Sequence, residues 1–366
     1  MSMISVHYSC RSNWRVINLL CALLSVVVWS GCGTKENRRP DQTVKLVPAA
    51  VIKLAETDTV YVGKPISVAV SSTGEIFVTD GFAKRVHRYA ATGQFLEVIG
   101  RQGNGPNEFM QPGMIYSYDD STLLITDEIR RDAVVWDLPQ KQARLRLPFS
   151  GQPGVYAVHK NSLIGSFQNP VKKTLAMRWT LPEVTPEYVG KLPPAFANGL
   201  FAMVWGRIPI DTYGDSIAYT TGDADYIRLT DSSWHVNDSI AIPRRVRRGI
   251  PEALDTTLTK GRNIYYVMNQ LSTPFVVHRL SGGRFGVIYV DATIRNNNTM
   301  SGKSYLTVVR KDYPARCIDV MIPIHDETTI PRMVFRGDTL YVVDQYVEGS
   351  KATVDVIKFA VGENIC

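Results

Sequence analysis

The segment from Pro65 to Gly100 constrains the fold more than any other part of this chain. It reads PISVAVSSTGEIFVTDGFAKRVHRYAATGQFLEVIG, and its alternation of apolar and polar residues predicts four short strands, at 67–72, 75–80, 85–90 and 94–99. Gly74 and Gly93 supply tight turns, so the strands form an antiparallel meander. One such sheet must stack on copies of itself to cover its two faces, and a ring of stacked sheets is a β-propeller.

The same scheme recurs along the chain. Pro112 opens a second copy, in which Asp127 ends the second strand as Asp80 does 47 residues earlier, a spacing typical of propeller repeats. Fainter strands follow, in a third copy at 156–168 and 175–181, a fourth at 215–221, 226–230 and 239–243, a fifth at 275–280, 285–292, 305–310 and 317–324, and a sixth at 332–335, 339–344 and 353–359. From Asp80 to Asp344 there is room for five steps of about 53 residues, which predicts six blades. A seventh blade would have to lie within 244–274.

The sixth copy lacks an outer strand, whereas a spare strand at 51–56 precedes the first copy. Pairing the two would close the ring and leave no open sheet edge between the first and last blades. We therefore predict an all-β, six-bladed β-propeller with four-stranded antiparallel blades, in which the N-terminal strand completes the last blade.

The first blade resembles the NHL repeat, with its proline entry, an Asp that ends the second strand and an Arg that opens the third. The matching residues are Pro65, Gly74, Ile76, Phe77, Val78, Asp80, Arg85, Val86, Gly93, Phe95, Leu96 and Gly100. The connector at 103–112, GNGPNEFMQP, is also similar to the link between blades in bacterial six-bladed propeller lipoproteins. The resemblance covers about residues 65–137, and it implies an NHL-repeat-like propeller lipoprotein of bacteria.

The N-terminus has the features of an export signal. Two arginines precede an apolar run at 16–29, which is about 14 residues long, short for a membrane span but suited to a signal peptide. Ser30-Gly31-Cys32 then resembles the lipobox of bacterial lipoproteins, although Trp29 stands where Leu is usual. The resemblance implies a signal peptide at 1–31 and lipidation of Cys32. The alternatives are a plain secretory signal or an uncleaved anchor.

The polar residues at 32–43 are expected to form a flexible tether from the membrane to a single propeller domain at 44–366. Gly33 follows the lipobox cysteine, where an Asp commonly signals retention in the inner membrane of Gram-negative bacteria. We therefore expect a lipid-anchored protein of the bacterial cell envelope, with the outer membrane favoured.

The net charge is +7, and removal of the two signal arginines would lower it to +5. This balance is mild, and no basic face with interleaved aromatic residues is evident, so we expect no nucleic-acid partner. We expect a monomer.

Two cysteines remain in the predicted domain once Cys32 and those of the signal are set aside, namely Cys317 and Cys366. An oxidising compartment would let them pair and hold down the C-terminus. The alternative is two unpaired thiols.

Four aspartates share one position, the end of a predicted second strand: Asp80, Asp127, Asp291 and Asp344. A carboxylate there can accept hydrogen bonds from the backbone of the next loop, and Asp80 could also pair with Arg85. We expect structural loop caps. The alternative is a ring of acids that binds a cation.

Four arginines cluster at the start of the predicted insertion at about 244–274, namely Arg244, Arg245, Arg247 and Arg248. Such a group can bind an acidic ligand, a sulfated or phosphorylated glycan, or lipid headgroups. We carry it as the candidate ligand-binding site, and a solvated charged loop is the alternative.

No local motif indicates catalysis. The six histidines have no zinc-ligand spacing, and no G-x-S-x-G elbow is present. The glycine-rich segment at 100–113 lacks the Lys and the helix of a phosphate loop, so we interpret it as a link between blades.

We predict no catalytic residue, metal or cofactor, and a non-catalytic binding or scaffold module for an envelope protein, peptide or glycan. The alternative is a hydrolase or lyase with a site in the central channel, which could depend on a metal.

Overall fold

The computed structural model describes residues 45–57, 59–149, 156–166, 173–193, 208–222, 224–243, 247, 272–294, 300–312, 319–324, 332–348 and 351–362. The chain divides into two units, Met1–Gln42 and Thr43–Cys366, and every described residue belongs to the second. Within the described part, no helix is long and apolar enough to cross a membrane.

Six antiparallel four-stranded sheets make up this unit. Blades 1 and 2 contain β2 (Pro65–Val70), β3 (Ile76–Asp80), β4 (Arg85–Tyr89) and β5 (Phe95–Ile99), then β8 (Pro112–Ser117), β9 (Thr122–Asp127), β10 (Asp132–Asp137) and β11 (Gln142–Pro148). Blades 3 and 4 contain β12 (Tyr156–His159), β13 (Ser162–Gly165), β14 (Thr174–Thr180) and β15 (Glu187–Lys191), then β16 (Ile210–Tyr213), β17 (Ser216–Tyr219), β18 (Tyr226–Thr230) and β19 (Val236–Ala241).

Blade 5 contains β20 (Ser272–Arg279), β21 (Arg284–Ile294), β22 (Met300–Arg310) and β23 (Asp319–Ile322), with the short 3₁₀ turn η3 (Ser281–Gly283). Blade 6 contains β24 (Arg332–Arg336), β25 (Thr339–Glu348) and β26 (Lys351–Ala360), and β1 (Ala50–Lys53) is its outer strand. Between blades 1 and 2, β6 (Arg101–Gln102) and β7 (Glu108–Phe109) form a short parallel pair.

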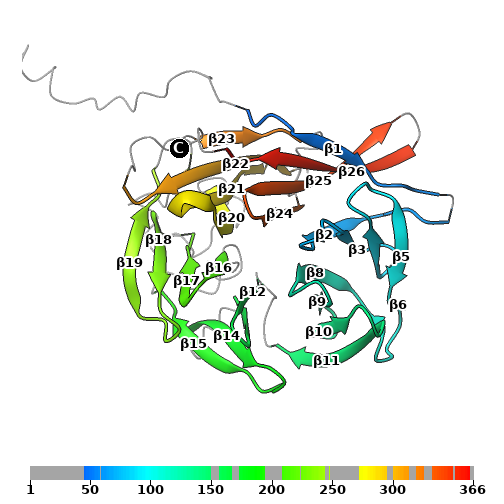
Figure 1. Ribbon diagram of the computed structural model, residues 1–366, viewed down its shortest axis with the longest axis horizontal. Helices are drawn as coiled ribbons and strands as arrows, with labels where there is room; N and C mark the ends of the chain where they lie inside the picture. The colour runs from blue at the N-terminus through cyan, green and yellow to red at the C-terminus, as the bar shows by residue number, and fades with distance from the viewer. Residues whose placement is uncertain are drawn as a thin grey trace, which may run out of the picture. The chain divides into compact units, whose positions relative to one another are not determined.

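The blades form a closed ring, with β2, β8, β12, β16, β20 and β24 toward its centre (Figure 1). Successive residues of a strand point to opposite faces, so each blade supplies apolar side chains to two neighbours. In β3, for example, Val78 packs toward blade 6 whereas Phe77 packs toward blade 2. Six buried clusters result, one for each pair of adjacent blades, including the pair of blades 6 and 1 that closes the ring. The six-bladed propeller predicted from the sequence is confirmed.

The predicted N-terminal closure is confirmed as well. β1 pairs antiparallel with β26 from Ala50–Lys358 to Lys53–Asp355, and Ile52 is buried between blades 6 and 1. The segment then passes the outer turn of blade 1, where Ala55 N donates to Gly93 O at 2.8 Å. A Cβ on Gly93 would lie 2.2 Å from Lys53 O, and the φ of Gly93 is +88°, so this turn requires glycine.

Several strand boundaries differ from those expected. The predicted strand at 156–168 is two strands, β12 and β13, separated by a turn at 160–161, and the expectation missed β15 and β16 altogether. β21 and β25 continue past Asp291 and Asp344, so these two aspartates do not end their strands. Cys32, Cys317 and Cys366 lie outside the described residues, and so do the signal peptide, the tether and most of the predicted insertion.

Candidate binding cleft between blades 1 and 2

Asp80 holds together the loops at one end of blade 1. Its buried carboxylate accepts hydrogen bonds from the backbone N–H groups of Gly63, Lys64, Phe82 and Ala83, at 2.8–3.2 Å. Burial raises the pKa of Asp80, but hydrogen bonds from His87 and from this backbone outweigh it and lower the pKa to about 2. This geometry is that of a loop cap.

The predicted pairing of Arg85 with Asp80 is indirect. Arg85 lies opposite Asp80 in the β3–β4 register, but Arg85 Nε donates to His87 Nε2 at 3.2 Å. The same His87 nitrogen lies 3.5 Å from Asp80 Oδ2. It therefore faces one donor and one acceptor, and whether it carries a proton decides which contact it makes.

Asp127 repeats the arrangement in blade 2. It is fully buried and accepts from the N–H groups of Met110, Gln111 and Arg130 at 2.7–3.2 Å. Asp291 differs, because Ser272 Oγ donates to it from the neighbouring strand, at 3.0 Å. Asp344 is buried within the β25–β26 ladder, opposite Asp355.

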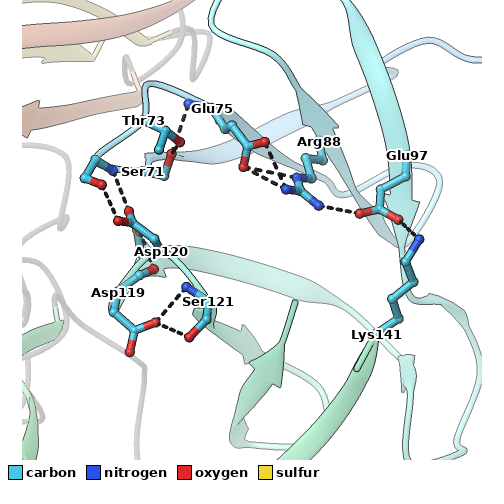
Figure 2. Close-up of polar contacts among 11 residues, drawn as sticks. Ser71, Thr73, Glu75, Arg88, Glu97, Asp119, Asp120, Ser121 and Lys141 are labelled. Carbon is cyan, nitrogen blue, oxygen red and sulfur yellow. Dashed lines mark hydrogen bonds and ion pairs between the residues drawn. The ribbon is translucent and has the colours of Figure 1, made fainter. Parts of the chain in front are cut away.

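A chain of charges links blade 1 to blade 2 (Figure 2). Arg88 on β4 donates to Glu75 at 2.9 Å and to Glu97 on β5 at 2.6 Å. On the far side of Glu97, Lys141 of blade 2 donates at 2.6 Å. Burial raises the pKa of Glu97, but hydrogen bonds from Lys141 and Arg88 outweigh it, so the pKa is lowered and the carboxylate stays ionised at neutral pH.

The inner turns of the two blades are joined as well. Asp120, between β8 and β9, accepts from the backbone N–H of Ser72 at 2.9 Å and from its hydroxyl (Figure 2). Both ends of the blade 1–2 seam are therefore fixed by polar contacts.

Beside this chain of charges, the seam contains a cleft of about 450 Å³. Five consecutive residues, Glu97 to Arg101, line it from blade 1, and Gly105 to Glu108 of the connector face them. Blade 2 contributes Trp136, Leu138 and Lys141. Trp136 and Leu138 are buried, so they provide an apolar wall.

The charges of the cleft are sorted by depth. The side chains of Arg101 and Lys141 are 82% and 71% exposed, whereas those of their partners Glu108 and Glu97 are only 20% and 22% exposed. Glu108 accepts from Gly105 N at 2.7 Å and from Arg101 Nε at 2.8 Å, and these two contacts lower its pKa. The carboxylates are thus occupied by donors, and the cleft presents cationic N–H groups to solvent.

The predicted arginine site is only partly described. Arg247 is buried, where it forms an ion pair with Asp225 and donates to Ala224 O at 3.3 Å. Arg244, Arg245 and Arg248 lie outside the described residues, so a role in ligand binding stays a prediction. Within the described ranges, no three His, Cys, Asp or Glu side chains are grouped so as to hold a metal ion.

Sequence reasoning missed the cleft. It identified the connector as a link between blades, but not that Arg101 and Glu108 pair across its glycine turns or that Lys141, 44 residues after Glu97, completes the wall. The available signal was the pair of charges flanking the glycine-rich run.

Comparison with known proteins supports the fold. A family model described as a 6-bladed beta-propeller, DUF5128, matches residues 35–179, a range that contains every residue of the cleft. No curated protein matches the chain.

Two solved structures from Bacteroides are similar to this chain. A protein of Bacteroides fragilis described as exported is 10% identical, with a TM-score of 0.62 over 87% of this chain and 98% of that one. A DUF4221 member from Bacteroides vulgatus is 11% identical, with a TM-score of 0.61 over 86% of this chain and 98% of that one. At such identities the likeness shows the fold, so the chain is placed in the class of six-bladed β-propellers.

Proposed function

We propose that this protein is an exported, lipid-anchored binding module of the bacterial cell envelope that holds an acidic ligand in the cleft between blades 1 and 2. The observation that carries the proposal is the cleft, whose two carboxylates are already bonded while Arg101 and Lys141 are exposed. A concave site with an apolar wall and a few convergent polar groups is the usual form of a ligand site.

Export and anchoring are supported by the N-terminal sequence, in which an apolar run is followed by Ser30-Gly31-Cys32. The likeness to a Bacteroides fragilis protein described as exported agrees with this. The NHL-like pattern of blade 1 fits the same class of propeller lipoproteins.

The anchor is tested by metabolic labelling with a fatty acid. We expect the full-length protein to incorporate the label and to fractionate with membranes, and Cys32→Ser to do neither, because the acyl chains supply the membrane affinity. The matched control is Cys10→Ser, which should leave labelling unchanged. Incorporation of label into Cys32→Ser would contradict the anchor.

The ligand site is tested with two acidic probes, poly-L-glutamate and polygalacturonate, by titration calorimetry at low salt. We expect at least one probe to bind, and the double variant Arg101→Ser/Lys141→Ser to weaken binding by about tenfold, since each exposed ion contact contributes about 0.2–1 kcal/mol. Binding should also weaken as salt is added.

The control for this experiment is Arg144→Ser. Arg144 is an exposed arginine of β11 that lies 3.9 Å from Asp137 and does not line the cleft. An equal loss of affinity in this variant would mean that net charge alone attracts the probes. Failure of both probes to bind the unmodified protein would refute the proposed site.

A further inference from the structure

The residues that line the cleft along blade 1 are consecutive, and this feature limits what the cleft can bind. Side chains alternate between the two faces of a strand, so a cavity on one face contacts every second residue only. A cleft bordered by all five residues from Glu97 to Arg101 therefore reaches the edge of the strand, where the main-chain N–H and C=O groups lie.

That edge belongs to the outermost strand of its sheet. Blade 1 has the order β2-β3-β4-β5, and among the described residues β5 pairs only with β4. In an antiparallel pair, every second residue directs its N–H and C=O away from the partner strand. The cleft thus gives access to main-chain donors and acceptors that the sheet does not use, which are the groups that capture an added strand.

The two exposed cations mark the ends of this edge. Lys141 Nζ lies 2.6 Å from Glu97 Oε2 at one end, and Arg101 is the residue at the other. Four strand steps separate Glu97 from Arg101, which is about 13 Å. Only Nε of Arg101 is engaged, by Glu108, among the residues described, so its terminal amino groups can bind a carboxylate.

We propose that the cleft captures an extended acidic peptide segment, which adds as a strand along the edge of β5 and places two carboxylates four residues apart on Lys141 and Arg101. The spacing follows from geometry, because residues i and i+4 of a strand share one face and lie about 13 Å apart. This inference rests on the proposed function and names the ligand class of the same site.

The test uses a labelled pentapeptide with blocked ends, Glu-Val-Thr-Val-Glu, and full-length protein, with affinity measured by fluorescence anisotropy. We expect Arg101→Ser and Lys141→Ser each to weaken binding by about three- to fivefold, and Arg144→Ser to leave it unchanged. A peptide with its acids at positions 1 and 4, which fall on opposite faces of a strand, should bind more weakly than the parent.

Backbone N-methylation separates strand addition from simple charge attraction. One register of alternate residues should lose at least about tenfold in affinity when N-methylated, and the other register should lose little, because only one set of amides faces β5. Hydrogen exchange should show slower exchange of amides within Glu97 to Ile99 when the peptide is bound.

Equal effects of the two N-methyl registers would overturn the inference. So would binding of a galacturonate oligosaccharide by a protein that ignores the peptide, although the acidic-ligand site would then stand. If neither the peptide nor the oligosaccharide binds, the site itself fails, which distinguishes the two proposals.

Discussion

Blades 1 and 6 carry an aspartate at the same point of the second strand, yet the chain behaves differently after it. In blade 1, β3 ends at Asp80 and a short loop returns to β4. In blade 6, β25 continues four residues beyond Asp344, to Glu348, and forms a long hairpin with β26.

The residues that follow explain the difference. Asp80 is followed by Gly81, whose missing Cβ lets the loop lie against Ile66, whereas Asp344 is followed by Gln345, Tyr346 and Val347. Aromatic and β-branched residues favour extended structure, so the strand continues. An aspartate at a strand end therefore acts as a cap only when the next residues let the backbone turn back over its carboxylate.

The largest expected effect comes from removing the cap itself. Asp80→Ala should lower the free energy of unfolding by about 3 kcal/mol or more, because several buried N–H groups lose their acceptor. Asp137→Ala is the matched control, since Asp137 Oδ1 accepts one backbone N–H, from Gln140 at 2.8 Å. It should cost about 1 kcal/mol, and urea denaturation measures both. Equal costs would mean that the number of donors around Asp80 does not matter.

The same pair has a defined pH dependence. The pKa of Asp80 is about 2 in the folded protein, below its ordinary value of 3.8, so its ionised form stabilises the fold above about pH 4. This contribution is lost as the pH falls from 4 toward 2, and the difference between the unmodified protein and Asp80→Ala should narrow by about 2 kcal/mol. A difference that stays constant down to pH 2 would refute the charged cap.

The architecture was predictable because it depends on patterns that repeat. The alternation in blade 1, the 47-residue spacing and the spare N-terminal strand all reflect one requirement, that every blade be covered on both faces and every edge between first and last blades be paired. Boundaries failed where local sequence overrides the repeat. β16 is only four residues long, and β21 and β25 outrun their aspartates.

The cleft could not be predicted in the same way. Its walls come from an outer strand, a connector and the outer turn of the next blade, so Glu97 and Lys141 meet only once two blades are packed. Charge pairs between blades have no fixed sequence spacing, because the length of each connector sets it. Periodicity therefore identifies the ring but not what lies in its seams.

A reciprocal exchange of the two residues after the aspartates is the smallest of the expected effects and the most direct test of the comparison. A Cβ on Gly81 would lie 2.8 Å from Ile66 Cγ1 and 2.9 Å from its Cδ1, so Gly81→Gln should destabilise the fold by about 2 kcal/mol through overpacking. Gln345→Gly should cost about 1 kcal/mol or less, since glycine in a strand mainly adds backbone entropy to the unfolded chain. Gln345 also donates weakly to Gly63 O at 3.4 Å, and Gln345→Ala serves as the control that removes this contact alone. If Gly81→Gln proves as mild as Gln345→Gly, close packing at Gly81 is not what ends β3, and the difference between the blades must come from the longer apolar run that follows Asp344.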